Sequence, residues 1–313
     1  MIRAALFCAL LALAPAATAA LAPGDYEFSV MLGEFKRSYL LHVPQQAAAG
    51  KPLPLVLNFH GGGGNARIQR SYSRMDKAAD RDGYLAVYPN GTSGIGDRLL
   101  TWNAGACCGP AERYKVDDVG FVLAVLEDLA RRMAYDRTRV YATGLSNGAM
   151  MAYRLAVEVP DRFAAVAGVA GAMTLSKFSP TLPVPVMHIH SEDDSLALYG
   201  GGMGITFPTS NTHHSVDSMI GKWVLHNRCP AEPRITATLK GNPGAVDAAH
   251  TATRYFYGPC RGGAEVVLWK LTGAGHVWPG GQIDYLPWLL GAGTAVIDAN
   301  REMWNFFSRF KRR

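Results

Sequence analysis

The chain has 313 residues, of which 49% are hydrophobic and 18% are charged, and this balance predicts a folded protein with a large apolar core. The formal net charge is +6, but the basic residues are scattered apart from the cluster RFKRR at the end. Because nucleic-acid-binding proteins gather lysine and arginine into a patch or stripe, this scatter argues against nucleic acid as a partner.

The first twenty residues, MIRAALFCALLALAPAATAA, have the pattern of a secretory signal peptide. Arg3 supplies a positive start, a short apolar run follows, and small residues at 17–19 supply a cleavage site. A membrane anchor is the alternative, but Pro15 interrupts the run and leaves it too short to span a bilayer. No later segment has an apolar stretch of spanning length. We expect residues 21–313 to form a single secreted or periplasmic domain.

After residue 20, apolar runs typical of buried strands alternate with helical patterns. Two strand-like runs around Gly33 predict an opening hairpin. Further strands are expected at 53–59, 84–89, 139–144, 163–171, 184–190 and 265–273, with helices at 117–134 and 295–310. This alternation predicts the α/β class, with a mostly parallel sheet covered on both faces. Residues 199–262 read as an insertion above the carboxyl ends of the strands, irregular except for one helical stretch, SVDSMIGKWVLHN.

The strand at 139–144 runs into the motif GLSNG, which places Ser146 between Gly144 and Gly148. A strand, G-x-S-x-G and then a helix is the sequence form of a nucleophile turn. The glycines permit a tight turn, and the start of the following helix favours developing negative charge. A serine that only caps the helix would not need glycine on both sides. The sequence therefore predicts Ser146 as a catalytic nucleophile.

A nucleophilic serine needs a general base, and in folds of this kind the base follows an acid further along the chain. We expect His276 to be the base, because it lies in the glycine-rich loop GAGHVWPGG just after a predicted strand. The other downstream histidines lie in an apolar strand or in the insertion and read as structural: His188, His190, His213, His214, His226 and His250.

The acid is expected between the serine and the histidine. Asp193 and Asp194 follow the strand at 184–190, and the local pattern does not separate them. Asp117 and Asp118 precede Ser146, so they fit the expected order poorly and fit helix capping better.

The segment NFHGGGGN follows a buried strand, and its glycines let the backbone approach a ligand closely. We expect one oxyanion-hole donor from the N–H of Gly61 or Gly62 and the other from the N–H of Asn147. A phosphate-binding loop is the alternative, but no G-K-[ST] follows the glycines.

The four cysteines that remain after residue 20 predict disulfides, as expected for an exported chain with an even number. Cys229 and Cys260 are the expected pair. Cys107 and Cys108 either bridge each other or pair elsewhere, since four cysteines allow three connectivities. No metal site is expected, because no second pair of Cys or His stands at zinc spacing.

Several of these segments together resemble the secreted esterases known as polyhydroxybutyrate depolymerases or feruloyl and acetylxylan esterases. They are NFHGGGGN, TWNAGACCGPAERYKVDDVGFV, GLSNGAMMAYRLA, HIHSEDDSLALYGGG and GAGHVWPGG, and the resemblance covers about residues 25–310. It implies an α/β-hydrolase fold and hydrolysis of carboxylic esters through an acyl-enzyme, without a cofactor. In the family pattern H-G-x-x-D-x-x-V-P-Y the acid is the fifth residue, which is Asp194 when counted from His190. Ala197 and Leu198 replace the valine and proline of that pattern.

The resemblance also bears on the substrate. Trp102 and Trp278 lie in motifs near the pocket of relatives, so each either stacks on an aromatic or sugar group or packs in the core. The Cys229/Cys260 spacing is similar to that of the family's disulfide around the inserted region. We expect feruloyl or acetyl esters of plant polysaccharide as substrates, with polyhydroxybutyrate, a related polyester or a small ester as the alternative. The oligomeric state stays open.

Overall fold

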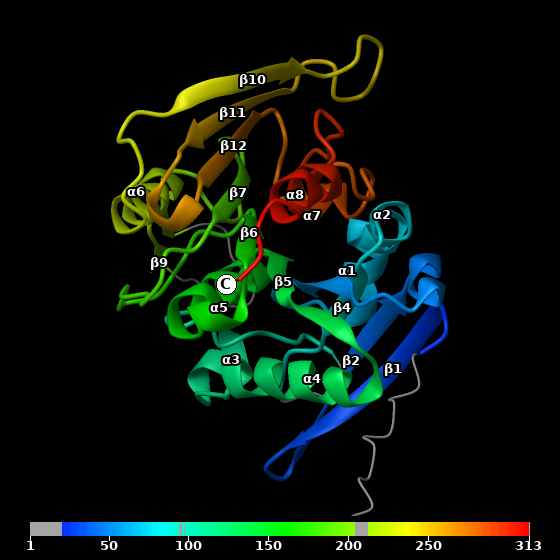
Figure 1. Cartoon of the computed structure of the whole chain (residues 1–313). Helices are drawn as coiled ribbons and strands as arrows, with labels where there is room; N and C mark the ends of the chain where they lie inside the picture. The colour runs from blue at the N-terminus through cyan, green and yellow to red at the C-terminus, as the bar shows by residue number, and fades with distance from the viewer. Residues whose placement is uncertain (1–20, 94–95, 97, 204–211, 313) are drawn as a thin grey trace, which may run out of the picture.

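The computed structural model describes residues 21–93, 96, 98–203 and 212–312. The signal peptide expected at 1–20 lies outside these residues. A ten-stranded sheet, with the order β1-β2-β4-β3-β5-β6-β7-β12-β11-β10, forms the centre of the molecule (Figure 1). Within the described ranges, no helix is long and apolar enough to cross a membrane.

The strands of this sheet include every strand that the sequence predicts. They are β1 (Gly24–Leu32), β2 (Phe35–Val43), β3 (Leu53–Phe59), β4 (Leu85–Pro89), β5 (Tyr135–Leu145), β6 (Ala165–Val169), β7 (Val186–Ser191), β10 (Arg234–Lys240), β11 (Thr251–Tyr257) and β12 (Val266–Thr272). The strands from β4 to β12 in the sheet order pair in parallel, and the strands outside them pair antiparallel. The prediction of a mostly parallel sheet is confirmed.

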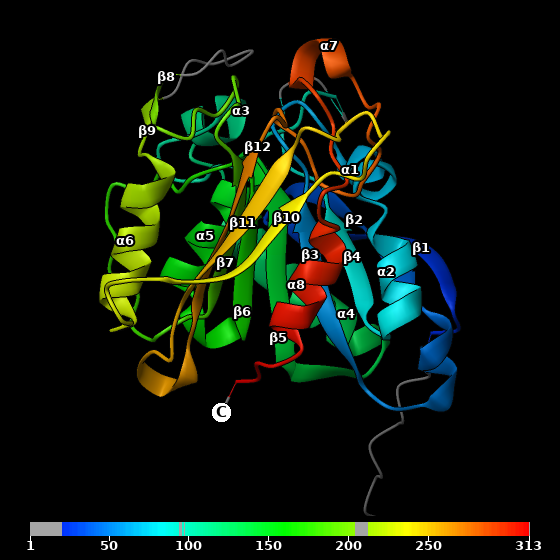
Figure 2. The same cartoon turned by 90° about the horizontal axis from the view of Figure 1, so that it is seen from above.

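Helices cover both faces of the sheet, as Figures 1 and 2 show. They are α1 (Ala66–Ser73), α2 (Met75–Asp82), α3 (Gly109–Arg113), α4 (Asp118–Arg132), α5 (Asn147–Glu158), α6 (Val216–His226), α7 (Pro287–Leu290) and α8 (Ala299–Phe307). Alternate residues of each strand point to opposite faces, so Leu55 and Leu57 of β3 join the core under α4, α5 and α6. Val56 joins the core under α1, α2 and α8.

The insertion differs from its prediction. The helical stretch is confirmed as α6, but the expectation that 234–257 is irregular was wrong, because β10 and β11 extend the sheet beyond β12. Side chains of β10 are mostly exposed, so the strand lacks the apolar run that marks a buried strand. Its sequence, RITATLK, therefore gave little signal.

Ahead of α6, the short strands β8 (Gly202–Met203) and β9 (Thr212–His213) form a separate hairpin-like pair. The disulfide Cys229–Cys260, with an S–S distance of 2.03 Å, joins the end of α6 to the turn before β12, which confirms the expected pair.

Candidate active site

Ser146 lies in a sharp turn between β5 and α5. Its φ of 55° is in the left-handed region, which is unusual for a residue with a side chain and marks a strained turn. The backbone N–H of Ser146 donates to the carbonyl of Val169 at 2.8 Å, which fastens the turn to the end of β6. The strand therefore delivers the serine to the carboxyl edge of the sheet, where it lines a cavity.

Both glycines of the motif are required by close packing. A Cβ on Gly144 would lie 2.5 Å from the carbonyl carbon of Gly148. A Cβ on Gly148 would collide with the carbonyl oxygen of Phe59 at the end of β3. The G-x-S-x-G spacing thus reflects how tightly the first turn of α5 packs against the neighbouring strand.

His276 and Asp194 meet at the same edge of the sheet. The Nδ1 atom of His276 lies 2.8 Å from Oδ2 of Asp194. The other carboxylate oxygen, Oδ1, accepts the backbone N–H groups of Leu196 at 2.9 Å and Ala197 at 2.8 Å. Asp193 points elsewhere and accepts the N–H of Gly273 at 2.6 Å. Of the two adjacent carboxylates, only Asp194 is brought to His276.

Asp194 is ionised in this setting. Burial by itself raises the pKa of a carboxyl group, but the charge of His276 and the hydrogen bonds from His190 and His276 outweigh it. The net result is a pKa well below the usual range for Asp194. An ionised carboxylate at Nδ1 keeps the proton of the His276 ring on that nitrogen and leaves Nε2 free to accept another.

Ser146 and His276 line the same cavity, although no hydrogen bond joins their side chains among the described residues. In unliganded hydrolases this contact is commonly long and shortens once substrate binds. The structure thus brings the three predicted catalytic residues to one place, with the acid–base contact formed.

The glycine loop after β3 lies over the nucleophile turn. A Cβ on Gly61 would lie 3.5 Å from Cβ of Ser146, and one on Gly62 would lie 3.7 Å from Cβ of Asn147. In the described part of the chain, the backbone N–H groups of Gly61, Gly62 and Asn147 have no acceptor. Free N–H groups beside a nucleophile are the arrangement that an oxyanion needs.

His60 supports this loop, a role that the sequence pattern does not indicate. Its Nδ1 lies 2.8 Å from the carbonyl oxygen of Gly61, and its Nε2 accepts the N–H of Gly91 at 2.9 Å. Burial lowers the pKa of His60 to about 4, so the ring is neutral and carries its proton on Nδ1. The carbonyl of Gly61 and the N–H of Gly62 belong to one peptide plane and point in opposite directions. By holding the carbonyl, His60 fixes the direction of the Gly62 N–H.

Trp102 and Trp278 do not line the cavity, so of the two alternatives left open for them, substrate binding and core packing, the structure shows core packing. Both side chains are buried in the core. The indole N–H of Trp102 donates to the carbonyl of His60 at 3.0 Å, and that of Trp278 donates to Asn300 at 3.2 Å. The backbone of Trp102 is also held by the side chain of Asn147, through contacts of 2.7 and 3.0 Å.

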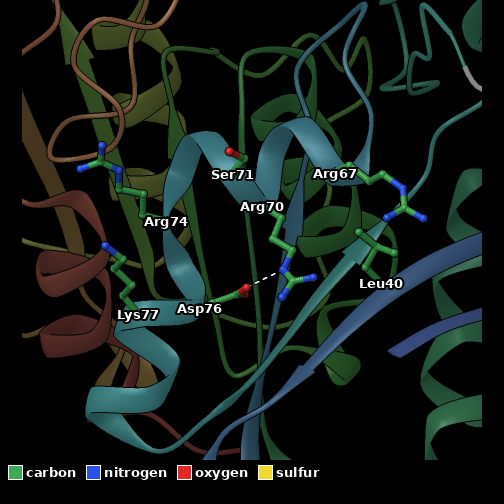
Figure 3. Close-up of a pocket in the computed structure, with 7 residues that line it drawn as sticks. All are labelled: Leu40, Arg67, Arg70, Ser71, Arg74, Asp76 and Lys77. Carbon is green, nitrogen blue, oxygen red and sulfur yellow. Dashed lines mark hydrogen bonds and ion pairs between the residues drawn. The ribbon is translucent and has the colours of Figure 1, made fainter. Parts of the chain in front are cut away.

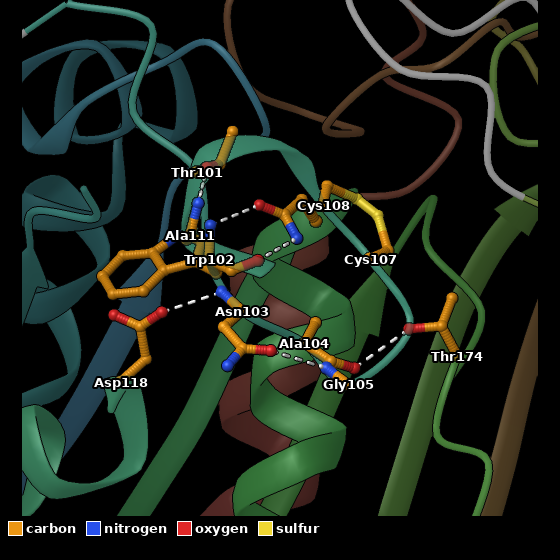
Figure 4. Close-up of a disulfide and its surroundings, with 11 residues drawn as sticks. Thr101, Trp102, Asn103, Ala104, Gly105, Cys107, Cys108, Ala111, Asp118 and Thr174 are labelled. Atoms are coloured by element: carbon orange, nitrogen blue, oxygen red, sulfur yellow. Dashed lines mark hydrogen bonds between the residues drawn. A yellow bond between two sulfur atoms is a disulfide. The ribbon is translucent and has the colours of Figure 1, made fainter. Parts of the chain in front are cut away.

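Cys107 and Cys108 bridge each other, which decides between the connectivities left open by the sequence (Figure 4). Both cysteines line the cavity at Ser146 and pack against Met150. Two hydrogen bonds hold the loop that carries them. The backbone N–H of Asn103 donates to the carboxylate of Asp118, and the hydroxyl of Thr174 donates to the carbonyl of Ala104 (Figure 4).

The cavity at Ser146 has a volume of about 310 Å³. Among the described residues that line it, none is a lysine, arginine, aspartate or glutamate. Its apolar wall consists of Ile68, Tyr72, Leu99, Cys107, Cys108, Leu145, Met150, Leu196, Ala197, Tyr285, Leu286, Leu289 and Leu290. Such a wall suits a neutral apolar group of a ligand.

A second cavity, of about 340 Å³, lies beside α1 and α2 and contains none of the predicted catalytic residues (Figure 3). It is lined by Leu40, Arg67, Arg70, Ser71, Arg74, Asp76 and Lys77. Arg70 forms ion pairs there with Asp76 and Asp25. Ser71 in this second cavity is a serine outside the candidate active site, and its substitution can serve as a control for that of Ser146.

The chain is similar to known esterases. The family described as Esterase PHB depolymerase matches residues 37–223. NocK of Nocardia uniformis subsp. tsuyamanensis, a protein assigned as an esterase, is 33% identical over 82% of this chain and 74% of its own length. Feruloyl esterase B of Piromyces equi is 26% identical over 80% of this chain. The bifunctional acetylxylan esterase/xylanase XynS20E of Neocallimastix patriciarum is 25% identical over 75% of this chain. The chain spans 44% and 30% of the lengths of these last two relatives.

Solved structures confirm the fold. A dienelactone hydrolase-like promiscuous phosphotriesterase from metagenomic libraries superposes with a TM-score of 0.59 at 13% identity, over 92% of this chain and 98% of that one. Acetyl xylan esterase from Aspergillus awamori superposes with a TM-score of 0.55 at 14% identity, over 90% of this chain and 99% of that one. The fold is therefore that of the α/β-hydrolases, as predicted.

Proposed function

Because the chain belongs to the Esterase PHB depolymerase family and is an esterase, we propose that it is an exported serine esterase that cleaves carboxylic esters through an acyl-enzyme. The observation that carries the proposal is the placement of Ser146 in a strained turn beside the pair of His276 and Asp194. Export is supported by the signal-like first twenty residues and by two disulfides, which persist in oxidising compartments.

In the proposed reaction, the Oγ of Ser146 attacks the ester carbonyl carbon while Nε2 of His276 takes its proton. Asp194 pairs with the imidazolium that forms. The carbonyl oxygen becomes negative and accepts hydrogen bonds from the N–H of Asn147 and of Gly61 or Gly62. The intermediate then expels the alcohol, which receives the proton from His276. Water attacks the acyl-enzyme in the same way and releases the acid.

The uncharged apolar cavity supports a neutral acyl group, and the two fungal relatives support feruloyl or acetyl esters of plant polysaccharide as the substrate class. A second candidate is polyhydroxybutyrate or a related polyester. It is favoured by the apolar rim next to the cavity, where Trp288 is 80% exposed beside Leu289. A small soluble ester is the third candidate, because the cavity volume of about 310 Å³ is that of a small-molecule site.

The test is the hydrolysis of p-nitrophenyl butyrate by the Ser146→Ala variant. We expect kcat to fall by roughly 10⁴-fold or more, as for loss of a serine nucleophile elsewhere. Ser71→Ala, which removes an exposed hydroxyl at the second cavity, serves as the matched control and should keep full activity. Retained turnover in Ser146→Ala would refute the assignment. A panel of methyl ferulate, acetylated xylan, hydroxybutyrate oligomers and polyester film then separates the substrate classes.

A further inference from the structure

Behind Asp194, a line of buried polar side chains runs from the active site into the core. It consists of Tyr153 on α5 and of His188 and His190 on β7, each at most 1% exposed. The two histidines are two residues apart in a strand, so they lie on the same face of the sheet. Polar groups buried this deeply need partners, and here the partners are one another.

The contacts are continuous. The hydroxyl of Tyr153 lies 2.8 Å from Nδ1 of His188, and Nε2 of His188 lies 2.9 Å from Nδ1 of His190. The Nε2 atom of His190 lies 2.7 Å from the carbonyl oxygen of Ala197 and 3.2 Å from Oδ2 of Asp194. His276 contacts that same carboxylate oxygen.

These contacts favour one order of protons along the line. A carbonyl oxygen only accepts, so His190 carries a proton on Nε2, and the tautomer that has this single proton has a bare Nδ1. In that tautomer the bare nitrogen accepts from Nε2–H of His188. Burial lowers the pKa of His188 well below its ordinary value, so its ring is neutral, and its Nδ1 is then the acceptor for the hydroxyl of Tyr153, which also lies 3.3 Å from the carbonyl oxygen of Met187. In this order the hydroxyl of Tyr153 and the Nε2–H groups of His188 and His190 all donate in the direction of Asp194.

We infer that His190 is a positioning residue for the catalytic acid, and that Tyr153 and His188 hold it in the single tautomer that can donate to Asp194. This inference rests on the proposed function, because it takes Asp194 as the acid. His190 also binds the carbonyl of Ala197, whose own N–H binds Oδ1 of Asp194. One imidazole therefore fixes both oxygens of the carboxylate, directly at Oδ2 and through the loop at Oδ1.

The surroundings of the line fit this role. A Cβ on Gly168 of β6 would lie 2.6 Å from the hydroxyl oxygen of Tyr153, so glycine there leaves room for the first donor. The ring of Tyr199 packs edge-on against His190, with ring centres 5.9 Å apart. Among the described residues, the titratable groups beside His190 include His213 on β9, whose pKa is lowered by burial, and Tyr199, whose hydroxyl donates to Asp217 at 2.6 Å.

The first test does not depend on activity. Nitrogen-15 spectra of the histidine rings in the intact enzyme should show His188 and His190 protonated on Nε2 and His276 protonated on Nδ1. A His190 ring protonated on Nδ1, or on both nitrogens, at neutral pH would overturn the inference. Should the enzyme show the expected tautomers and hydrolyse no ester, the proposed function would fail while the hydrogen-bond order stood.

The second test compares His190→Phe with His190→Gln. Phenylalanine removes the donor, and we expect kcat to fall about tenfold with KM nearly unchanged, as for loss of one hydrogen bond to a charged group. Without that donor the carboxylate attracts the His276 imidazolium more strongly, so His276 is protonated at higher pH. The low-pH side of the kcat/KM profile then moves to higher pH. Glutamine keeps an N–H donor and should restore part of kcat and of the profile.

Met187→Leu, a buried change on the opposite face of β7, is the matched control and should behave as wild type. If His190→Phe does not fold, Tyr153→Phe removes one oxygen from the far end of the line. It should lower kcat about two- to threefold and move the profile in the same direction. Wild-type kcat and profile in both His190→Phe and His190→Gln would overturn the inference. The inference would also be overturned if His190→Phe only lowered the fraction of active enzyme molecules, with kcat per active molecule and the pH profile of kcat/KM unchanged.

Discussion

Oδ2 of Asp194 lies 2.8 Å from Nδ1 of His276, while the carboxylate of its neighbour Asp193 accepts the backbone N–H of Gly273 at 2.6 Å. One step along the chain therefore separates a carboxylate that contacts the proposed general base, His276, from one that fastens a turn. The difference arises from the turn itself, because the N–H groups of Leu196 and Ala197 hold Asp194 inward.

This relationship predicts opposite outcomes for two equivalent substitutions. Asp194→Asn places an amide against Nδ1 of His276, which favours the wrong tautomer, and kcat should fall by about 10³- to 10⁴-fold. Asp193→Asn keeps an oxygen that can accept the Gly273 N–H, and kcat should stay within about twofold of wild type. Steady-state kinetics on p-nitrophenyl butyrate measures both. A larger loss in Asp193→Asn would reassign the acid.

The buried His60 predicts how stability depends on pH. Its pKa is about 4 in the folded protein, against an ordinary value of 6.5, so the unfolded chain binds more protons between these values. Stability should therefore fall as the pH is lowered from about 6.5 to about 4, by up to about 3 kcal/mol from this residue. Urea unfolding at several pH values measures the slope. His60→Gln removes the titration, and an equally steep slope in that variant would contradict the prediction.

The disulfide between Cys229 and Cys260 predicts a loss of stability without a loss of chemistry. It closes a loop with a sequence separation of 31, and removing such a bridge costs about 3–4 kcal/mol in the chain-entropy estimate. The double variant Cys229→Ala/Cys260→Ala should unfold at lower urea concentration. Neither cysteine lines the cavity at Ser146, so kcat at 25 °C should be unchanged. A fall in kcat in the fully folded variant would contradict this separation.

Parts of the site that depend on contacts between residues close together in the chain could be predicted from the sequence. Parts that depend on packing between residues far apart in the chain could not. The tight turn at Ser146 was predictable because its glycines are forced by contacts within G-x-S-x-G and with the strand beside it. Asp193 and Asp194 could not be separated from residue pattern alone, because the choice depends on which way one turn folds. The role of Trp102 could not be decided from the sequence, because the side chain of a loop tryptophan can point either into the cavity or into the core. The partner of its indole, the carbonyl of His60, is 42 positions away in the chain.

The side chain of Asn147 offers the last prediction, because its backbone and side chain have different tasks. The backbone N–H has no acceptor among the described residues, whereas the side chain accepts from and donates to the backbone of Trp102, at 2.7 and 3.0 Å. Asn147→Ala keeps the N–H but leaves two buried groups of Trp102 without partners, which should cost about 1–3 kcal/mol of unfolding free energy.

Activity should respond much less than stability in this variant. Because the proposed oxyanion donor is retained, kcat of the folded Asn147→Ala enzyme should fall by less than about tenfold, against the 10²- to 10³-fold typical of a lost oxyanion donor. Urea unfolding and kinetics on the same preparation measure the two effects. Asn147→Asp is the harsher comparison, since it keeps an acceptor for the Trp102 N–H but sets a carboxylate oxygen against the Trp102 carbonyl and a negative charge beside the proposed oxyanion donors, so it should lose more stability and more activity than Asn147→Ala. A fall of 10³-fold in kcat with unchanged stability would instead place the Asn147 side chain in the reaction.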